Sequence, residues 1–238
     1  MRSLTCNWKT IGLILFICGM LAVPSAATAR PLTVFVDPAH GGDDRGVELD
    51  RGDFEKELTL DVAKEIENRF RGNRDISIIL TRNGDETVPV ERRRTMAREK
   101  KADLFISLHI NAGFGAGAAG YEIYFSDGSW VRKQGESGDI IIEDMIENRI
   151  RNDSIRLAQI IEYHIGSVFP RQGRGLRSSP VLILSGMENA GILVEFGFGT
   201  NVKDRKKLLD PNIREAIARA VCDGIQAYNK GREKQDAE

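Results

Sequence analysis

The chain has 238 residues, of which 41% are hydrophobic and 29% are charged, and its formal net charge at pH 7 is −1. This composition is typical of one globular domain and excludes a fibrous, low-complexity or intrinsically disordered protein. Basic and acidic residues are interspersed, without the basic stripe of a nucleic-acid-binding surface, so we expect no nucleic-acid partner.

The first 29 residues are predicted to be a secretory signal peptide. Arg2 and Lys9 precede an apolar run at residues 11–23, and small residues that offer a cleavage site follow this run. A permanent transmembrane anchor is the alternative, but the run is shorter than the roughly 20 residues that a membrane span requires. We therefore expect an exported protein whose single mature domain covers residues 30–238, with no stable membrane anchor after cleavage.

The cysteine count limits the covalent chemistry of the mature domain. Cys6 and Cys18 lie in the predicted signal peptide, so the mature chain retains only Cys222 and forms no internal disulfide. Cys222 lies within an apolar helical pattern near the C-terminus, which favours a buried, inert thiol over a nucleophile.

From residue 31 onward, short β-branched segments alternate with helical patterns. In chain order the predicted elements are a strand at 33–36, a helix at 57–71, a strand at 76–81, a helix at 89–101, strands at 104–109 and 121–125, a helix at 154–168, strands at 181–184 and 192–194, and a helix at 211–230. This alternation predicts a single α/β domain: a mixed, mostly parallel twisted sheet of about six strands with helices on both faces. Residues 126–152 are predicted to be an insertion over the sheet that includes a short amphipathic helix at 139–147.

Two of the three histidines follow hydrophobic strands directly. His40 comes after the strand at 33–36 and His109 closes the strand at 104–109, at the end of the strands where α/β sheets place their active sites. Two scarce imidazoles at corresponding strand ends can share one metal ion, and Gly41 and Gly42 allow the backbone to turn away sharply. The third histidine, His164, lies in a helical pattern and is predicted to be a packing or surface residue.

A hydrolytic zinc site typically adds one carboxylate to two histidines and leaves the fourth position open. Glu55 and Glu57 are both candidates at the start of the first helix, and position alone does not choose between them, because either could simply be an acid favoured by the helix dipole. Glu195 closes an apolar strand, where an unpaired buried charge would cost several kcal/mol. It is either a general base that faces a site or a salt-bridged structural acid.

Five segments, taken in order, resemble the motifs of the zinc-dependent N-acetylmuramoyl-L-alanine amidases of the bacterial cell wall. They are residues 37–42 (DPAHGG), 55–60 (EKELTL), 80–82 (LTR), 102–112 (ADLFISLHINA) and 193–201 (LVEFGFGTN). Together they extend over essentially the whole mature chain, and five motifs in the right order are far more specific than any one of them.

The resemblance implies a function and a role for each site residue. The metal ligands of the family fall on His40, Glu55 and His109, so the resemblance selects Glu55 rather than Glu57, and the catalytic glutamate of the family falls on Glu195. The implied cofactor is Zn²⁺, and the implied reaction is hydrolysis of the amide bond between N-acetylmuramic acid and L-alanine in peptidoglycan, with Glu195 as general base and then acid. The implied role is cell-wall remodelling or daughter-cell separation, in the periplasm or in the cell wall after secretion.

Other positions match the family or depart from it. Arg93 and residues 175–177 match positions that are structural or face the substrate. Ala39, Arg98 and Ile110 depart from the family pattern without removing a ligand, and we expect Ile110, beside a ligand, to narrow the space for substrate.

Some division-associated members of this family carry a regulatory segment that occludes the zinc ion, at the position of residues 126–152, and a protein activator at the division site is implied for such members. The acidic residues that could supply an occluding carboxylate are Glu136, Asp139, Glu143, Asp144 and Glu147. A solvated acidic helix without a regulatory role is the alternative.

Two other functions are compatible with the same residues. A zinc peptidase that cuts stem peptides requires the same metal and base, and a catalytically inactive module could bind peptidoglycan or regulate an enzyme. The presence of three ligand types together with Glu195 favours an enzyme over the inactive module.

Overall fold

The fold is that of a computed structural model, and residues 30–115, 117–126 and 139–236 are described. The elements described below all belong to the compact unit that begins at Pro31. The predicted signal peptide at residues 1–29 lies outside the described residues and stays a prediction. Among the described helices, none combines the length and the hydropathy that crossing a bilayer requires.

Six strands form the central sheet, in the spatial order β4-β1-β5-β8-β6-β7. Their bounds are β1 Leu32–Pro38, β4 Ile76–Leu80, β5 Leu104–Asn111, β6 Tyr121–Phe125, β7 Gly173–Ser178 and β8 Ala190–Phe198. The pairs β4–β1, β1–β5, β5–β8 and β6–β7 are parallel, and only β6 runs antiparallel to β8. The prediction of a mixed, mostly parallel sheet of about six strands is therefore confirmed.

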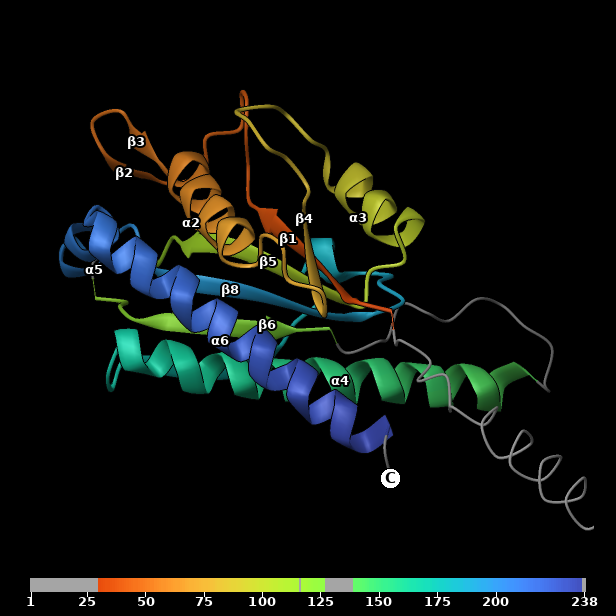
Figure 1. Ribbon diagram of the computed structural model, residues 1–238. Helices are drawn as coiled ribbons and strands as arrows, with labels where there is room; N and C mark the ends of the chain where they lie inside the picture. The colour runs from red at the N-terminus through yellow and green to blue at the C-terminus, as the bar shows by residue number, and fades with distance from the viewer. Residues whose placement is uncertain (1–29, 116, 127–138, 237–238) are drawn as a thin grey trace, which may run out of the picture. The chain divides into compact units, whose positions relative to one another are not determined.

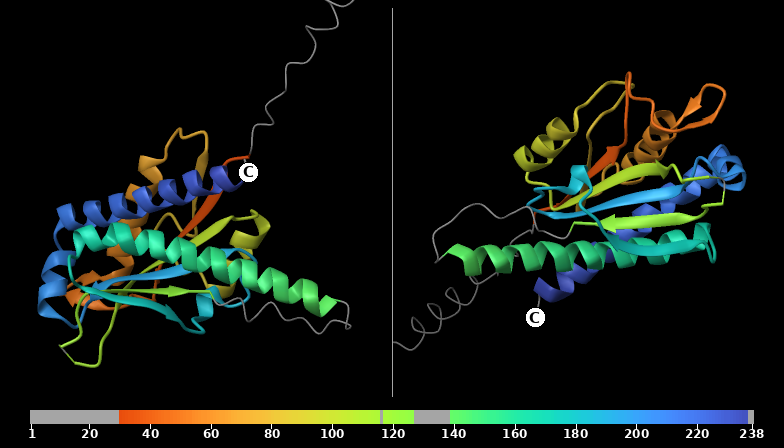
Figure 2. Two further views of the ribbon diagram at one scale, coloured as in Figure 1. Left: turned by 90° about the horizontal axis from the view of Figure 1, so that it is seen from below. Right: turned by 180° about the vertical axis from the view of Figure 1, so that it is seen from behind.

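Helices cover both faces of this sheet, as predicted (Figure 1). On one face lie α2 (Glu55–Arg69), α4 (Asp139–Val168) and α6 (Pro211–Asp236), whose apolar side chains share the larger core with the sheet. On the other face, a smaller core contains α3 (Val90–Glu99) and the 3₁₀ turn η1 (Leu182–Leu184). Figure 2 shows α3 and α4 on opposite sides of the sheet. Two short elements complete the fold: the hairpin of β2 (Glu48–Asp50) and β3 (Asp53–Phe54), and α5 (Val202–Leu208) after β8.

The central strands are apolar on both faces because both faces are covered. Along β5, Ile106 and Leu108 belong to the larger core, whereas Phe105 belongs to the smaller one. This alternation fixes which side chains point to the α3 face: every second residue of each strand. Phe105, Ser107 and His109 therefore share that face, which becomes important for the site.

The prediction of a strand at 181–184 is wrong. Residues 182–184 form η1 shortly after Pro180. Ile183 and Leu184 pack into the smaller core, while Leu182 stays 66% exposed. The sixth strand is instead β7, which the sequence analysis missed. Its sequence, GRGLRS, is polar and glycine-rich because β7 is an edge strand with no buried residue, and a hydrophobicity pattern does not detect such a strand.

Residues 139–152 are not a separate short helix. They form the first half of α4, a single helix of 30 residues that continues through the predicted helix at 154–168. No proline or glycine occurs between residues 139 and 165, so nothing interrupts the helical backbone. The rest of the predicted insertion, residues 127–138, lies outside the described residues.

The smaller core supports the site, and Phe105 at its centre has no exposed surface. We expect Phe105→Ala to lower the free energy of unfolding by about 3–5 kcal/mol, because it leaves a cavity between the sheet and α3. Urea denaturation measures the change. Phe114→Ala, at a fully exposed aromatic, is the matched control and should shift stability by less than about 0.5 kcal/mol. Equal losses in the two variants would contradict the assignment of this core.

Candidate metal centre

The backbone turns sharply where β1 ends. His40 has φ = 60°, and Gly41 and Gly42 have φ = 126° and 61°, so three successive residues take conformations that favour glycine. A Cβ on Gly42 would lie 2.1 Å from Thr87 Oγ1, so a side chain does not fit there. The predicted role of the two glycines is confirmed.

A buried carboxylate lies directly beneath this turn. Asp37, at the end of β1, accepts hydrogen bonds from Thr81 Oγ1 (2.5 Å), Ser107 Oγ (2.7 Å) and Arg93 Nη1 (2.7 Å). Arg93 also donates from Nη2 to the carbonyl oxygen of His40 (2.5 Å), and its side chain is only 5% exposed. Of the two roles expected for Arg93, the structure thus shows the structural one: it neutralises Asp37 and holds the strained backbone of His40.

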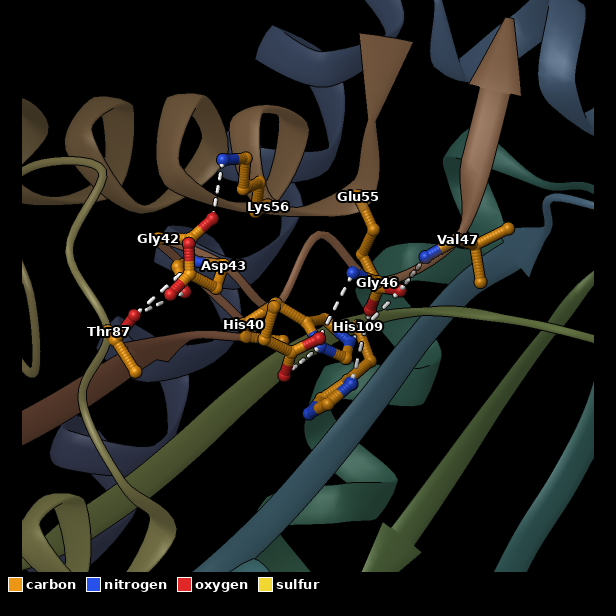
Figure 3. A network of polar contacts seen from close by, with 12 residues as sticks. His40, Gly42, Asp43, Gly46, Val47, Glu55, Lys56, Thr87 and His109 are labelled. Atoms are coloured by element: carbon orange, nitrogen blue, oxygen red, sulfur yellow. Dashed lines mark hydrogen bonds and ion pairs between the residues drawn. The ribbon is translucent and has the colours of Figure 1, made fainter. Parts of the chain in front are cut away.

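The side chains of His40, Glu55 and His109 converge (Figure 3). Their candidate ligand atoms all lie within 4.8 Å of one another. His40 Nε2 is 3.1 Å from Glu55 Oε2, and His109 Nδ1 is 3.2 Å from Glu55 Oε1. A pair of imidazoles and one carboxylate is a donor set that suits Zn²⁺.

The structure distinguishes Glu55 from Glu57 by their surroundings. Glu55 is 1% exposed, and besides the two histidines it accepts hydrogen bonds from the backbone N–H groups of Ile110 (2.9 Å) and Val47 (3.1 Å). The Glu57 side chain is 47% exposed and accepts from the Phe54 N–H at the start of α2 (3.2 Å). Glu57 is therefore the helix-capping acid, and Glu55 faces the two histidines.

Asp44 was not identified from the sequence. Its Oδ2 lies 2.8 Å from His40 Nδ1, whereas the other ring nitrogen, Nε2, faces Glu55. A carboxylate in this position keeps the proton on Nδ1 and leaves Nε2 as a lone-pair donor toward a metal. Its short distance from His40 in the sequence, four residues, was the available signal.

When no metal ion is bound, the side chains of His40, Glu55 and His109 shift one another's pKa values. Burial alone would raise the pKa of Glu55, but the hydrogen bonds and charges of His109 and His40 lower it to about 2. Burial would lower the pKa of His40, but Glu55 and then Asp44 raise it to about 9, and Glu55 likewise raises the pKa of His109. A divalent cation bound by these side chains would displace protons from them.

Glu195 lies beside this cluster on the neighbouring strand. Its Cα is in register with His109 across the β5–β8 pair, so the two side chains share one face of the sheet. Glu195 Oε2 is buried and has no hydrogen-bond partner among the described residues. Burial, helped by the charges of Glu55 and Glu122, raises the pKa of Glu195 to about 7 although His109 opposes the shift. Such a carboxyl group can both accept and release a proton near neutral pH.

A cavity of about 410 Å³ opens next to His40 and His109, between the start of α3 and η1. Most of its lining is apolar: Val88, Pro89, Val90, Val181, Leu182, Ile183 and Leu193. Ile110 does not line it, contrary to expectation. Ile110 follows His109 along β5, so its side chain points to the opposite face and is buried in the larger core.

The remaining predictions concern residues away from this cluster. His164 is half-buried and its ring contacts Tyr163, so the packing or surface role is confirmed. Cys222 is a buried free thiol, as predicted. Among the described residues, Glu143, Asp144 and Glu147 take no part in the candidate metal cluster; Glu136 and the Asp139 side chain are not described.

Fold and site together define the class of this protein. A mostly parallel α/β sheet that presents two histidines and a buried carboxylate, beside an unpartnered glutamate, has the parts of a mononuclear metal hydrolase. The comparison with family models identifies the family: residues 34–227 match the model of the N-acetylmuramoyl-L-alanine amidases (Amidase_3), so the chain belongs to this family.

Individual relatives agree with this assignment. The chain is 29% identical over 226 residues to the uncharacterised protein YqiI of Bacillus subtilis, and the match covers 93% of this chain and 97% of YqiI. It is 25% identical to the N-acetylmuramoyl-L-alanine amidase AmiC of Escherichia coli, where the match covers 85% of this chain but only 54% of AmiC. The crystal structure of an N-acetylmuramoyl-L-alanine amidase from Clostridium difficile 630 is similar with a TM-score of 0.67 and 29% identity, covering 84% of this chain and 97% of that one.

The pKa shifts predict how the stability of the metal-free protein depends on pH. Because the pKa of His40 is about 9 in the folded protein, its contribution is complete below pH 6.5 and is lost as the pH rises through 9. The raised pKa of Glu195 acts in the same direction between pH 4.5 and 7. With a chelator present, we expect the free energy of unfolding to fall by roughly 2–3 kcal/mol from pH 6.5 to pH 9.

Urea denaturation at the two pH values tests this expectation. In His40→Gln the fall should be clearly smaller, because the titrating imidazole is absent. If the variant and the wild type lose the same stability, His40 does not carry the effect.

The contact between Asp44 and His40 predicts an effect on metal affinity. Asp44→Ala should weaken zinc binding about 10–100-fold, because the His40 ring loses the group that orients it and fixes its proton. Competition with a chromophoric chelator measures the affinity. Asp43→Ala, one position earlier and exposed, is the matched control and should bind zinc as the wild type does. Unchanged affinity in Asp44→Ala would show that the contact has no such role.

Proposed function

We propose that this protein is a zinc-dependent N-acetylmuramoyl-L-alanine amidase that hydrolyses the amide bond between N-acetylmuramic acid and L-alanine in peptidoglycan. The observation that carries the proposal is the convergence of His40, Glu55 and His109 beside the buried, unpartnered Oε2 of Glu195, in a chain of this family. The chain spans about half the length of the E. coli relative AmiC. The activity is therefore proposed from the site residues of this chain and not from the activity of AmiC.

In this proposal His40 Nε2, His109 Nδ1 and the Glu55 carboxylate hold the zinc ion. When bound, the ion supplies Lewis-acid polarisation of the amide carbonyl and lowers the pKa of water. Glu195 accepts the proton of the attacking water at its carboxylate and then delivers it to the leaving amine of L-alanine. The buried surroundings of Glu195 suit both steps, because they hold its pKa near 7.

Export and cellular role are part of the same proposal. The predicted signal peptide would bring the enzyme to the periplasm or the cell wall, where peptidoglycan is found. There it would act in cell-wall remodelling or daughter-cell separation. A protein activator at the division site is proposed as a partner, on the family resemblance alone.

The zinc peptidase and the inactive wall-binding module are the competing functions. A peptidase cuts within the stem peptide, whereas the amidase releases intact stem peptides that begin with a free L-alanine amine. An inactive module would bind zinc without turnover. Mass spectrometry of the products from purified peptidoglycan distinguishes all three.

The role of Glu195 gives the test of the mechanism. We expect Glu195→Gln to lower the rate of stem-peptide release by about 10²–10⁴-fold, because the amide cannot accept the proton, while zinc content stays at the wild-type level. Glu188→Gln, at an exposed position in the loop before β8, is the matched control and should keep full activity. Undiminished release by Glu195→Gln would remove Glu195 from the mechanism.

A further inference from the structure

A further buried carboxylate, Glu122, lies on the far side of Glu195 from the candidate metal ligands. It belongs to β6 and its side chain is 6% exposed. Four donors reach it: Arg174 Nε (2.5 Å) and Arg177 Nη2 (3.4 Å) at Oε1, and Tyr124 Oη (2.8 Å) and Asn111 Nδ2 (3.2 Å) at Oε2. Glu122 is therefore saturated with hydrogen bonds. Burial alone would raise the pKa of its carboxyl group, but Arg174, Tyr124 and Arg177 lower it.

Strand register places this cluster in line with the candidate metal centre. The Cα of Glu195 pairs with His109 on one side and with Glu122 on the other, so the three side chains form a row across β5, β8 and β6 on the α3 face. Beyond β6 comes the edge strand β7, which carries Arg174 and Arg177. The two arginines thus lie two strand spacings from Glu195, about 10 Å at ~4.8 Å per strand.

Both arginines keep donors for a ligand. Their side chains are 40% and 46% exposed, although each contacts the buried Glu122. Among the described residues, Arg174 hydrogen-bonds only through Nε and stacks its guanidinium on the Phe198 ring at 5.2 Å, and Arg177 hydrogen-bonds only through Nη2. Two guanidinium groups contact one carboxylate, so the cluster of Arg174, Arg177 and Glu122 has a net charge of +1. The contacts with Glu122 orient both guanidinium groups.

A purely structural role does not require this arrangement. Arg174 at 2.5 Å would neutralise Glu122 alone, and Tyr124 and Asn111 already satisfy its other oxygen. The second arginine, Arg177, leaves a surplus positive charge at the exposed edge of the row. The forked N–H groups of its guanidinium match the two oxygens of a carboxylate.

We propose that Arg174 and Arg177 bind a free carboxylate group of the stem peptide, with Glu122 as the residue that positions both. This inference rests on the proposed amidase function, because it takes the scissile amide to lie between the metal ligands and Glu195. An extended peptide advances about 3.3–3.6 Å per residue, so the ~10 Å to β7 corresponds to a carboxylate within the first three residues of the peptide. The peptide then runs from Glu195 over β6 toward β7.

The test uses two soluble muramyl peptides with the same sequence, in which the carboxylates of the first three residues are either all free or all converted to carboxamides. We expect the wild type to cleave the free acid with a lower KM. In Arg177→Gln the KM for the free acid should rise about tenfold or more, while kcat/KM for the carboxamide stays within twofold of wild type. In Arg174→Gln, which also removes the main partner of Glu122, the preference for the free acid over the carboxamide should be lost. Arg177→Lys keeps the positive charge but not the forked pair of N–H groups. Its KM for the free acid should lie between the values of the wild type and Arg177→Gln.

Arg219→Gln, at an exposed arginine that pairs with Glu215 on α6, is the matched control and should leave both substrates unaffected. A structural role alone would lower the cleavage of both substrates equally, and that result, or a wild type with no preference for the free acid, would overturn the inference. A wild type that cleaves neither substrate would instead overturn the proposed amidase function. Melting temperatures of the variants identify any loss that comes from unfolding.

Discussion

A carboxylate buried at the end of β1 must be neutralised where it lies, and the geometry of the site depends on how this is done. Asp37 is 1% exposed, and leaving such a charge unpaired would cost several kcal/mol. Its partners come from three different elements: Thr81 after β4, Ser107 on β5 and Arg93 on α3. The hydrogen bonds to this one carboxylate therefore fix the positions of β1, β4, β5 and α3 relative to one another. Arg93 extends this constraint to the His40 carbonyl and so holds a left-handed backbone that would otherwise relax.

The site has two sides of different chemistry. Toward α3 and η1 the candidate ligands border an apolar cavity, whereas toward β6 and β7 Glu195 separates them from Glu122 and its two arginines. Both sides lie on the face of the sheet where, among the described residues, the cover consists of the short helix α3 and the 3₁₀ turn η1. The opposite face, beneath α2, α4 and α6, holds most of the apolar core. The face beneath α2, α4 and α6 thus contributes most of the hydrophobic stability, while the α3 face is less covered and holds the candidate site.

The sequence predicted what local patterns encode. His40 and His109 could be found because histidines are scarce and both follow apolar strands. Choosing Glu55 over Glu57 required the family resemblance, since both acids lie in the first turn of α2 and only the tertiary structure shows which one is buried beside the histidines. Ile110 was expected to narrow the space for substrate, although the period of two along its strand already placed its side chain opposite that of His109.

Elements that depend on tertiary context were harder to predict. The strand β7 has no apolar face and owes its conformation to pairing with β6, while η1 has strand-like residues but closes as a turn after Pro180. Asp44 was missed because a contact between an exposed loop acid and a ring nitrogen leaves no periodic signal in the sequence.

The parallel pairing of β5 with β8 also determines the order in which the site can form. Residues 104–111 pair with residues 190–198, and closing so long a segment costs more entropy than any local contact. The contact between His40 and Glu55 spans a much shorter stretch of chain, from β1 to the start of α2. Because β1 pairs directly with β5, His40, Glu55 and His109 can come together before β8 joins the sheet. Glu195 reaches this cluster only when β8 pairs with β5, so the proposed general base depends on the longer-range contact.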